Sequence, residues 1–130
     1  MRAPLRPAAD DRGSAVIEFV LVAPLLALVG LAVLQLVLAL HVRSTLTAAA
    51  GEGARVAALI GVDPMMGERR ARDVLEGNLA ADAVADVRVS QVVLRGSRMI
   101  EVTIDARLPL LGMLGPRVLS VTGHAVQESV

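Results

Sequence analysis

The sequence predicts a membrane-anchored α+β fold, in which a long N-terminal helix is followed by a second short helix and a small antiparallel sheet of about three strands. Three observations predict it. The chain has 130 residues and carries one long apolar run near its start. A Gly-Val-Asp-Pro stop follows at 61–64, and after about residue 86 the apolar spacing changes from a helical period to a period of two.

Composition excludes several classes of function. With 13 basic and 13 acidic residues the formal net charge is zero, so there is no basic excess of the kind that binds nucleic acid. The absence of cysteine excludes disulfides, cysteine metal sites and a cysteine nucleophile. One Phe, with no Tyr or Trp, leaves no stacking surface for bases or sugars. We therefore expect no nucleic-acid partner, no small-molecule substrate and no cofactor.

The apolar run is long enough to span a membrane. From Phe19 to Leu40 the chain carries no charge. At about 1.5 Å per residue, such a helix crosses the roughly 30 Å hydrocarbon core of a bilayer. We therefore divide the chain into a leader (1–13), a transmembrane helix (14–41) and an extracytoplasmic α+β domain (42–130). The positive-inside rule, applied to the arginines of the leader, favours a single-pass protein of the cytoplasmic membrane with a cytoplasmic N-terminus.

The segment from Val42 to Ile60 is predicted to continue the same helix into water, because it is rich in alanine. It carries two stripes at helical spacing, which are Leu46, Ala50 and Ala54, and Ala49, Gly53 and Ala57. Small residues at this spacing allow close helix approach. The partner is either another subunit or, as we favour, the chain's own domain.

A second helix is predicted from Met65 to about Ala81. Gly61 ends the first helix, Asp63 caps the second, and Pro64 occupies its first position. Its apolar face is predicted to contain Ala71, Val74, Leu75, Asn78 and Leu79. Its wet side carries the i, i+4 pairs Glu68–Arg72 and Arg72–Glu76.

Three strands are predicted at Val87–Leu94, Met99–Leu108 and Val118–Gln127, with a turn at Gly96-Ser97. In the middle strand the inward residues are Ile100, Val102, Ile104 and Ala106, and the outward residues are Glu101, Thr103, Asp105 and Arg107. One face of the third strand contains Leu119, Val121, Gly123 and Ala125. The apolar but broken segment 108–117 is predicted either to cap the core or to enter lipid headgroups.

No catalytic constellation is present. The chain has no P-loop, no G-x-G-x-x-G after a strand and no G-x-S-x-G motif. His41 and His124 are its only histidines and lie far apart in the sequence, the first at the helix exit and the second on the polar phase of a strand. Solvation explains the acids Glu101 and Asp105. We therefore expect a protein that is not an enzyme and has no metal site.

Glu18 is the one acid at the start of the apolar run, where charge near lipid is costly. One interpretation is an acid at a helix N-terminus, favoured there by the helix dipole. In the other, the chain is cut after Gly13, and Glu18 then lies one turn beyond the free amine of Ser14. That amine, or the amine of a neighbouring subunit, would be the partner that a carboxylate in an apolar bundle requires.

Two stretches of the sequence resemble a known family. The segment R-G-S-A-V-I-E-F-V-L-V-A-P-L-L (Arg12–Leu26) is similar to the N-terminus of TadE-like proteins, the pseudopilins of tight-adherence, or Flp-type, pilus systems. The second stretch, His41–Ala58, is similar to the family's segment after the membrane, which ends in a signature corresponding here to Glu52, Gly53, Ala54 and Arg55. The Asp63-Pro64 helix and the strand-rich tail also fit. Gly51 departs from the family, where a polar residue is more usual.

The resemblance implies a role for individual positions. Gly13 would precede the cut made by a prepilin peptidase, and Ser14 would become the mature N-terminus. Glu18 and Phe19 would serve recognition or assembly. Pro24 matches the family's proline and is expected to kink the transmembrane helix.

The resulting hypothesis is a pilin-like, non-enzymatic pseudopilin or minor pilin that takes part in assembly of a Flp-type pilus. Its expected partners are membrane lipid, a prepilin peptidase and other pilin or pilus-assembly subunits. The alternative is a membrane-tethered extracytoplasmic binding or regulatory module with an uncleaved signal anchor. A main filament subunit is the less favoured third interpretation, because the family's dedicated pilins are much shorter.

Overall fold

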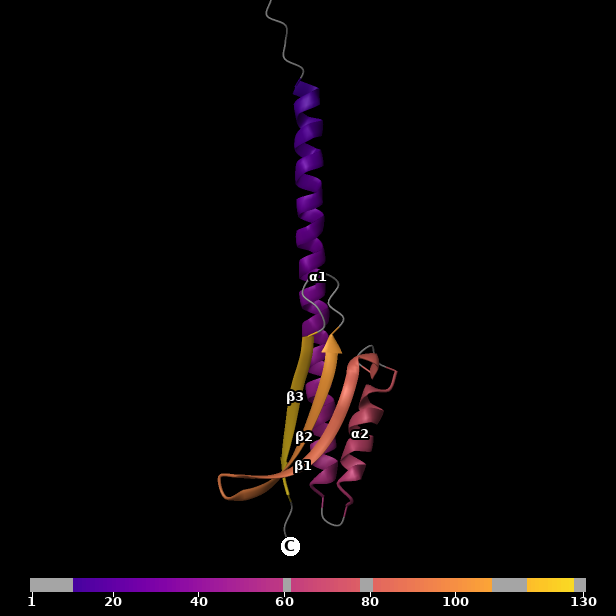
Figure 1. The fold of residues 1–130 in the computed structure, drawn as a ribbon, viewed down its shortest axis with the longest axis vertical. Coiled ribbons are helices and arrows are strands. Elements are labelled where there is room, and N and C mark those ends of the chain that lie inside the picture. The colour runs from indigo at the N-terminus through magenta and orange to yellow at the C-terminus, as the bar shows by residue number, and fades with distance from the viewer. Residues whose placement is uncertain (1–10, 60–61, 78–80, 109–116, 128–130) are drawn as a thin grey trace, which may run out of the picture. The chain divides into compact units, whose positions relative to one another are not determined.

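A computed structural model describes residues 11–59, 62–77, 81–108 and 117–127 of the chain (Figure 1). The elements are α1 (Asp11–Ala57), α2 (Met65–Leu75), the 3-10 helix η1 (Ala81–Ala83), β1 (Val84–Leu94), β2 (Ser97–Leu108) and β3 (Arg117–Val126). The predicted fold class of a long helix, a short helix and a three-stranded antiparallel sheet is confirmed. The chain forms two compact units, residues 1–36 and 37–130, which are described separately.

The first unit contains the apolar part of α1. From Gly13 to Leu36 every side chain is exposed except those of Ala23 and Gln35, which are half-buried. Among the described helices, α1 is the one that is long and apolar enough to cross a membrane, judged by its length and composition. The helix begins at Asp11, ahead of the predicted start, and Pro24 lies inside it.

In the second unit α1 packs on its own domain. Leu46, Ala49, Ala50 and Ala54 are completely buried, Ala57 is 3% exposed, and Gly53 is buried. Both predicted stripes therefore face the core of residues 37–130, as favoured from the sequence. The helix ends at Ala57, three residues before the predicted Ile60.

Helix α2 begins as predicted but ends early. Asp63 Oδ1 accepts a hydrogen bond from the Met65 N–H at 3.0 Å, and Pro64 is already helical (φ −51°, ψ −29°), so Asp63 acts as the cap. The helix ends at Leu75 because Glu76 is extended (φ −60°, ψ 131°) and Gly77 takes a positive φ of 77°. The predicted end at Ala81 is therefore wrong.

The end of α2 at Leu75 decides which of its predicted side-chain contacts form. Ala71 and Leu75 are buried and Val74 is partly buried, as predicted, whereas Asn78 and Leu79 lie outside the described residues. Glu68 pairs with Arg72 as predicted. The predicted Arg72–Glu76 pair is wrong, because Glu76 has left the helix and no longer lies one turn beyond Arg72.

The three strands form one antiparallel sheet in the order β1-β2-β3. β1 and β2 are joined by a two-residue turn in which Arg95 and Gly96 both have positive φ, 51° and 81°. The turn lies one residue before the predicted Gly96-Ser97, because Ser97 already pairs with Leu94. β1 also begins earlier than predicted, with an irregular register between Val84 and Asp86. Residues 109–116 of the apolar segment lie outside the described residues.

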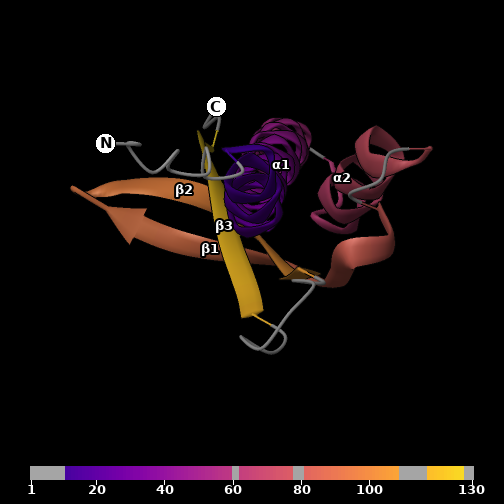
Figure 2. The same cartoon turned by 90° about the horizontal axis from the view of Figure 1, so that it is seen from above.

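The sheet has one covered face and one open face. Both α2 and the part of α1 in this unit lie on the same side of it (Figure 2). On that side Ile100, Val102, Ile104 and Ala106 of β2 are completely buried, as the alternation predicted. Val121 and Gly123 of β3 are buried beside them. The open face carries the outward residues of all three strands.

Gly123 is the point at which α1 comes closest to the sheet. A Cβ atom at this position would lie 2.5 Å from both the Ala50 carbonyl oxygen and the Gly51 nitrogen of α1. The neighbouring Gly51 is different, since a Cβ there would meet nothing within 4 Å. Of these two neighbouring glycines, only Gly123 needs to be glycine for packing.

We expect Gly123→Ala to lower the free energy of unfolding by about 1–3 kcal/mol, because the backbone of α1 must move away from β3. The matched control Gly51→Ala should be neutral or raise it by up to about 1 kcal/mol, through helix propensity. The measurement is urea unfolding of the full chain in detergent, followed by far-UV circular dichroism because the chain lacks Trp and Tyr. Equal stabilities of the two variants would contradict the close approach.

Candidate functional site

The predicted processing site lies in the first turns of α1. Gly13 and Ser14 are exposed and helical, two and three residues after the helix begins at Asp11. A Cβ at Gly13 would meet nothing within 4 Å, so no described atom crowds this position. The Gly13–Ser14 peptide bond is therefore accessible, but its backbone is helical rather than extended.

Glu18 lies one helical turn beyond Ser14. Residues i and i+4 share a helix face with Cβ atoms roughly 5–6 Å apart, so a free amine at Ser14 would be within reach of the Glu18 carboxylate. Glu18 is exposed, and within the described part of the chain it has no hydrogen bond or ion pair. It is also the only charged residue between Gly13 and Leu40. A single carboxylate therefore marks an otherwise uncharged helix surface.

Phe19 and Pro24 belong to the same exposed surface. The ring of Phe19 is 72% exposed, so it contributes nothing to the packing of its own unit. Pro24 has no N–H, which leaves the Val20 carbonyl without its helical partner, although helix is present on both sides. The kink at Pro24 stays a prediction.

The four residues of the predicted signature all lie near the C-terminal end of α1, and three of them act inside unit 37–130. Glu52 forms ion pairs at 3.7 Å with Arg55, on the same helix, and with Arg70 of α2. A Cβ at Gly53 would lie 2.7 Å from the Gly67 carbonyl oxygen, so this glycine permits the close contact between α1 and α2. Ala54 is fully buried in the core, whereas Arg55 remains exposed.

Comparison with protein families agrees with this geometry. The family model described as TadE-like protein matches residues 13–55. Residues 13–55 are a TadE-like segment. The match begins at Gly13 and ends at Arg55, so it contains the whole processing region and the whole signature. Comparison with curated proteins and with solved structures finds no match.

The TadE-like segment lies within α1. It contains the exposed apolar surface of the first unit and the small-residue stripes of the second. Helix α2 and the sheet lie beyond the matched residues.

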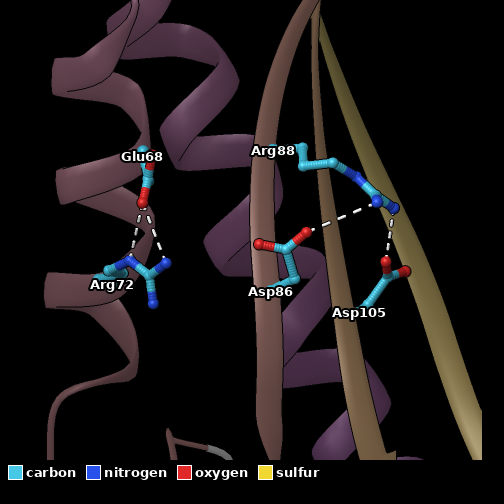
Figure 3. Close-up of polar contacts among 5 residues, drawn as sticks. All are labelled: Glu68, Arg72, Asp86, Arg88 and Asp105. Atoms are coloured by element: carbon cyan, nitrogen blue, oxygen red, sulfur yellow. Dashed lines mark hydrogen bonds and ion pairs between the residues drawn. The ribbon is translucent and has the colours of Figure 1, made fainter.

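Beyond the TadE-like segment, the open face of the sheet carries paired charges (Figure 3). Arg88 of β1 donates a hydrogen bond to Asp105 of β2 and lies 3.5 Å from Asp86. On the other side of β2, His124 Nε2 lies 2.9 Å from Glu101 Oε2. Both acids were expected to be only solvated. The turn at Arg95-Gly96 sets the β1–β2 register that brings Arg88 near Asp105, whereas the separate register of β2 with β3 places Glu101 opposite His124.

Figure 3 also shows the charged face of α2, which is separate from these pairs. Both Nε and Nη2 of Arg72 donate to Glu68 Oε1, at 3.1 and 3.0 Å. A groove of about 630 Å³ lies beside this helix, between Pro64, Met65 and Glu68 and the residues of β1 and β2. Ser90 and Glu101 of its lining face each other across β1 and β2, and the Glu101 carboxylate contacts His124.

The two histidines are not brought together. His41 lies on α1, and its carbonyl oxygen accepts hydrogen bonds from the hydroxyls of Ser44 and Thr45. His124 lies on β3, where it faces Glu101 of β2. Within the described residues no three His, Cys, Asp or Glu side chains are grouped closely enough to hold a metal ion. The described side chains thus point to packing and surface contacts.

Among the residues of the predicted signature, Gly53 should contribute more to the free energy of unfolding than the charge of Glu52. We expect Gly53→Ala to lower the free energy of unfolding by about 1–3 kcal/mol, because its new Cβ meets the Gly67 carbonyl. Glu52→Gln should change it by less than about 1 kcal/mol, because its ion pairs are exposed to water. Urea unfolding of the full chain in detergent compares the two. A larger loss for Glu52→Gln would assign the signature to its charge instead.

Proposed function

We propose that this chain is a non-enzymatic pseudopilin or minor pilin that takes part in assembly of a Flp-type pilus. The observation that carries the proposal is the TadE-like match, with a single carboxylate, Glu18, on the exposed apolar surface of α1. Such a surface requires lipid or other apolar helices around it. The proposed partners are accordingly membrane lipid, a prepilin peptidase and other pilus subunits.

Anchoring follows from the physical character of residues 13–36. Their large apolar side chains are exposed, which water disfavours and the hydrocarbon core of a membrane accepts. The arginines before Gly13 support a cytoplasmic N-terminus in the cytoplasmic membrane. In this orientation unit 37–130 is extracytoplasmic.

Cleavage after Gly13 changes the electrostatics of the helix end. It removes the leader and creates an ammonium group at Ser14, together with backbone N–H groups that lack helical partners. Both favour a nearby carboxylate. We propose that this carboxylate is Glu18, either of the same subunit as the Ser14 amine or of a neighbouring subunit. The helix can then leave lipid and pack against others in a register set by this pair.

A second candidate function is favoured by one observation. The Gly13–Ser14 bond is helical, and a peptidase must first unwind it to reach an extended backbone. If it is not cut, α1 serves as an uncleaved signal anchor, and unit 37–130 is a tethered binding or regulatory module. Glycine at position 13 lowers the cost of unwinding, because it is a poor helix former. We therefore prefer the processed form.

We expect the protein isolated from its native membrane to begin at Ser14. Intact-mass and N-terminal analysis measure this directly. Gly13→Leu places a large side chain before the scissile bond and should leave the leader attached, whereas the control Gly30→Leu, also in open space on α1, should be cut normally. A wild-type chain that retains its leader would instead support the tethered module.

We expect Glu18→Gln to reduce pilus assembly while unit 37–130 stays folded. Losing one member of a buried ion pair costs about 3–5 kcal/mol, which is more than about a hundredfold in an assembly equilibrium. Pili are counted by electron microscopy, and processing is followed by mass. Glu52→Gln is the matched control, since it removes an acid outside the apolar helix. Unchanged processing and assembly in Glu18→Gln would contradict the proposed pairing of Glu18 with the Ser14 amine.

A further inference from the structure

The outer edge of β3 has backbone groups that no described strand pairs with. β3 is the last strand in the order β1-β2-β3. The Gln127 N–H donates a hydrogen bond to the Arg98 carbonyl of β2 at 3.0 Å. In an antiparallel pair, only every second residue directs its backbone groups toward the neighbouring strand, so the odd-numbered residues of β3 face β2. The backbone groups of the alternate residues therefore point away from β2. These residues are Val118, Ser120, Thr122, His124 and Val126.

The other edge of the sheet is protected, which makes the contrast informative. β1 carries the charged Asp86 and Arg88, has an irregular register near Val84 and contacts α2 beside it. Charges, bulges and covering helices are the means by which proteins prevent pairing at sheet edges. β3 has fewer of these features, since its ten residues contain no acid and no proline and keep an uninterrupted register with β2.

The side chains around this edge indicate what could pair with it. Val118 and Val126 are 67% and 63% exposed at the two ends of the strand, with hydroxyl side chains between them. The nearby acids are already paired, Glu101 with His124 and Asp105 with Arg88, whereas Arg107 of β2 is exposed opposite Val118. On the covered face, Gly123 holds β3 against α1. The edge is thus extended and partly apolar, with an exposed arginine near its Val118 end.

We propose that the outer edge of β3 binds an extended acidic segment of another protein, which adds to the sheet as a fourth strand. Main-chain hydrogen bonds to Ser120, Thr122 and His124 give the affinity, as in other cases of strand addition. β-branched side chains of the segment pack beside Val118 and Val126, and an acid faces Arg107. The proposal does not depend on the pilus role, because it uses only unit 37–130.

The test is amide hydrogen exchange, measured by NMR on the ¹⁵N-labelled full chain in detergent. The probe is a synthetic eight-residue peptide of alternating threonine and valine in which two threonines are replaced by glutamate. At ten times its Kd, the peptide should slow exchange of the outward amides of β3 about tenfold. The amides that already bond to β2 should not change. A peptide with the same side chains but N-methylated at alternate residues should have no effect.

Two variants separate the β3 edge from other surfaces. Thr122→Pro removes an outward N–H without removing a bond to β2 and should abolish binding. Gln91→Pro makes the matching change on the outer edge of β1 and should bind the peptide normally. The N-methylated peptide keeps the test decisive if Thr122→Pro fails to fold.

Three results would overturn the proposal. The first is protection without alternation along β3, and the second is equal protection by the N-methylated peptide. The third is concentration-dependent protection of the outward amides with no peptide present, which would assign the edge to a second copy of this chain. Loss of pilus assembly with normal peptide binding would affect the proposed function alone.

Discussion

The backbone contact between Gly123 of β3 and the Ala50-Gly51 peptide of α1 is the constraint on which unit 37–130 depends. It requires small residues on both elements, because any side chain would separate helix and strand. A second contact of the same kind joins Gly53 of α1 to Gly67 of α2. The core residues of segment 42–58 are five alanines with Val42 and Leu46, so this core is built without a single aromatic residue.

The same helix meets opposite demands along its length. In residues 13–36 the side chains are mostly large, apolar and exposed, which suits lipid or the helices of neighbouring subunits. In residues 42–58 the buried side chains are mostly small, namely five alanines together with Val42 and Leu46. The TadE-like segment spans both parts and ends at Arg55. Side-chain size along one helix therefore changes between an exposed apolar surface and a surface packed within unit 37–130.

The two faces of the sheet also differ in the side chains that they carry. Its covered face is apolar, and its open face holds charges that are mostly offset by neighbours across the strands, such as Glu101 with His124. Ion pairs that are exposed to water add little to stability, so these charges keep the open face soluble but do not hold the sheet together. Within the described structure, no strand pairs with the outward backbone groups of β3. The outer edge of β3, rather than the open face of the sheet, is therefore the surface at which we propose that a partner binds.

The sequence by itself determined the elements that depend on local periodicity. The uncharged run to Leu40 predicted the first half of α1, and the period of two identified the buried residues of β2, because burial follows spacing within one element. It misplaced the end of α2, since Gly77 competes with a helical pattern that continues beyond it. Only the tertiary structure decided the register at Arg95-Gly96 and the contact of Gly123 with α1. The contact joins residues distant in the chain, and periodicity gives a direction for each side chain but no distance between elements. The turn is local, but it places Arg95 at a positive φ that its residue type rarely adopts.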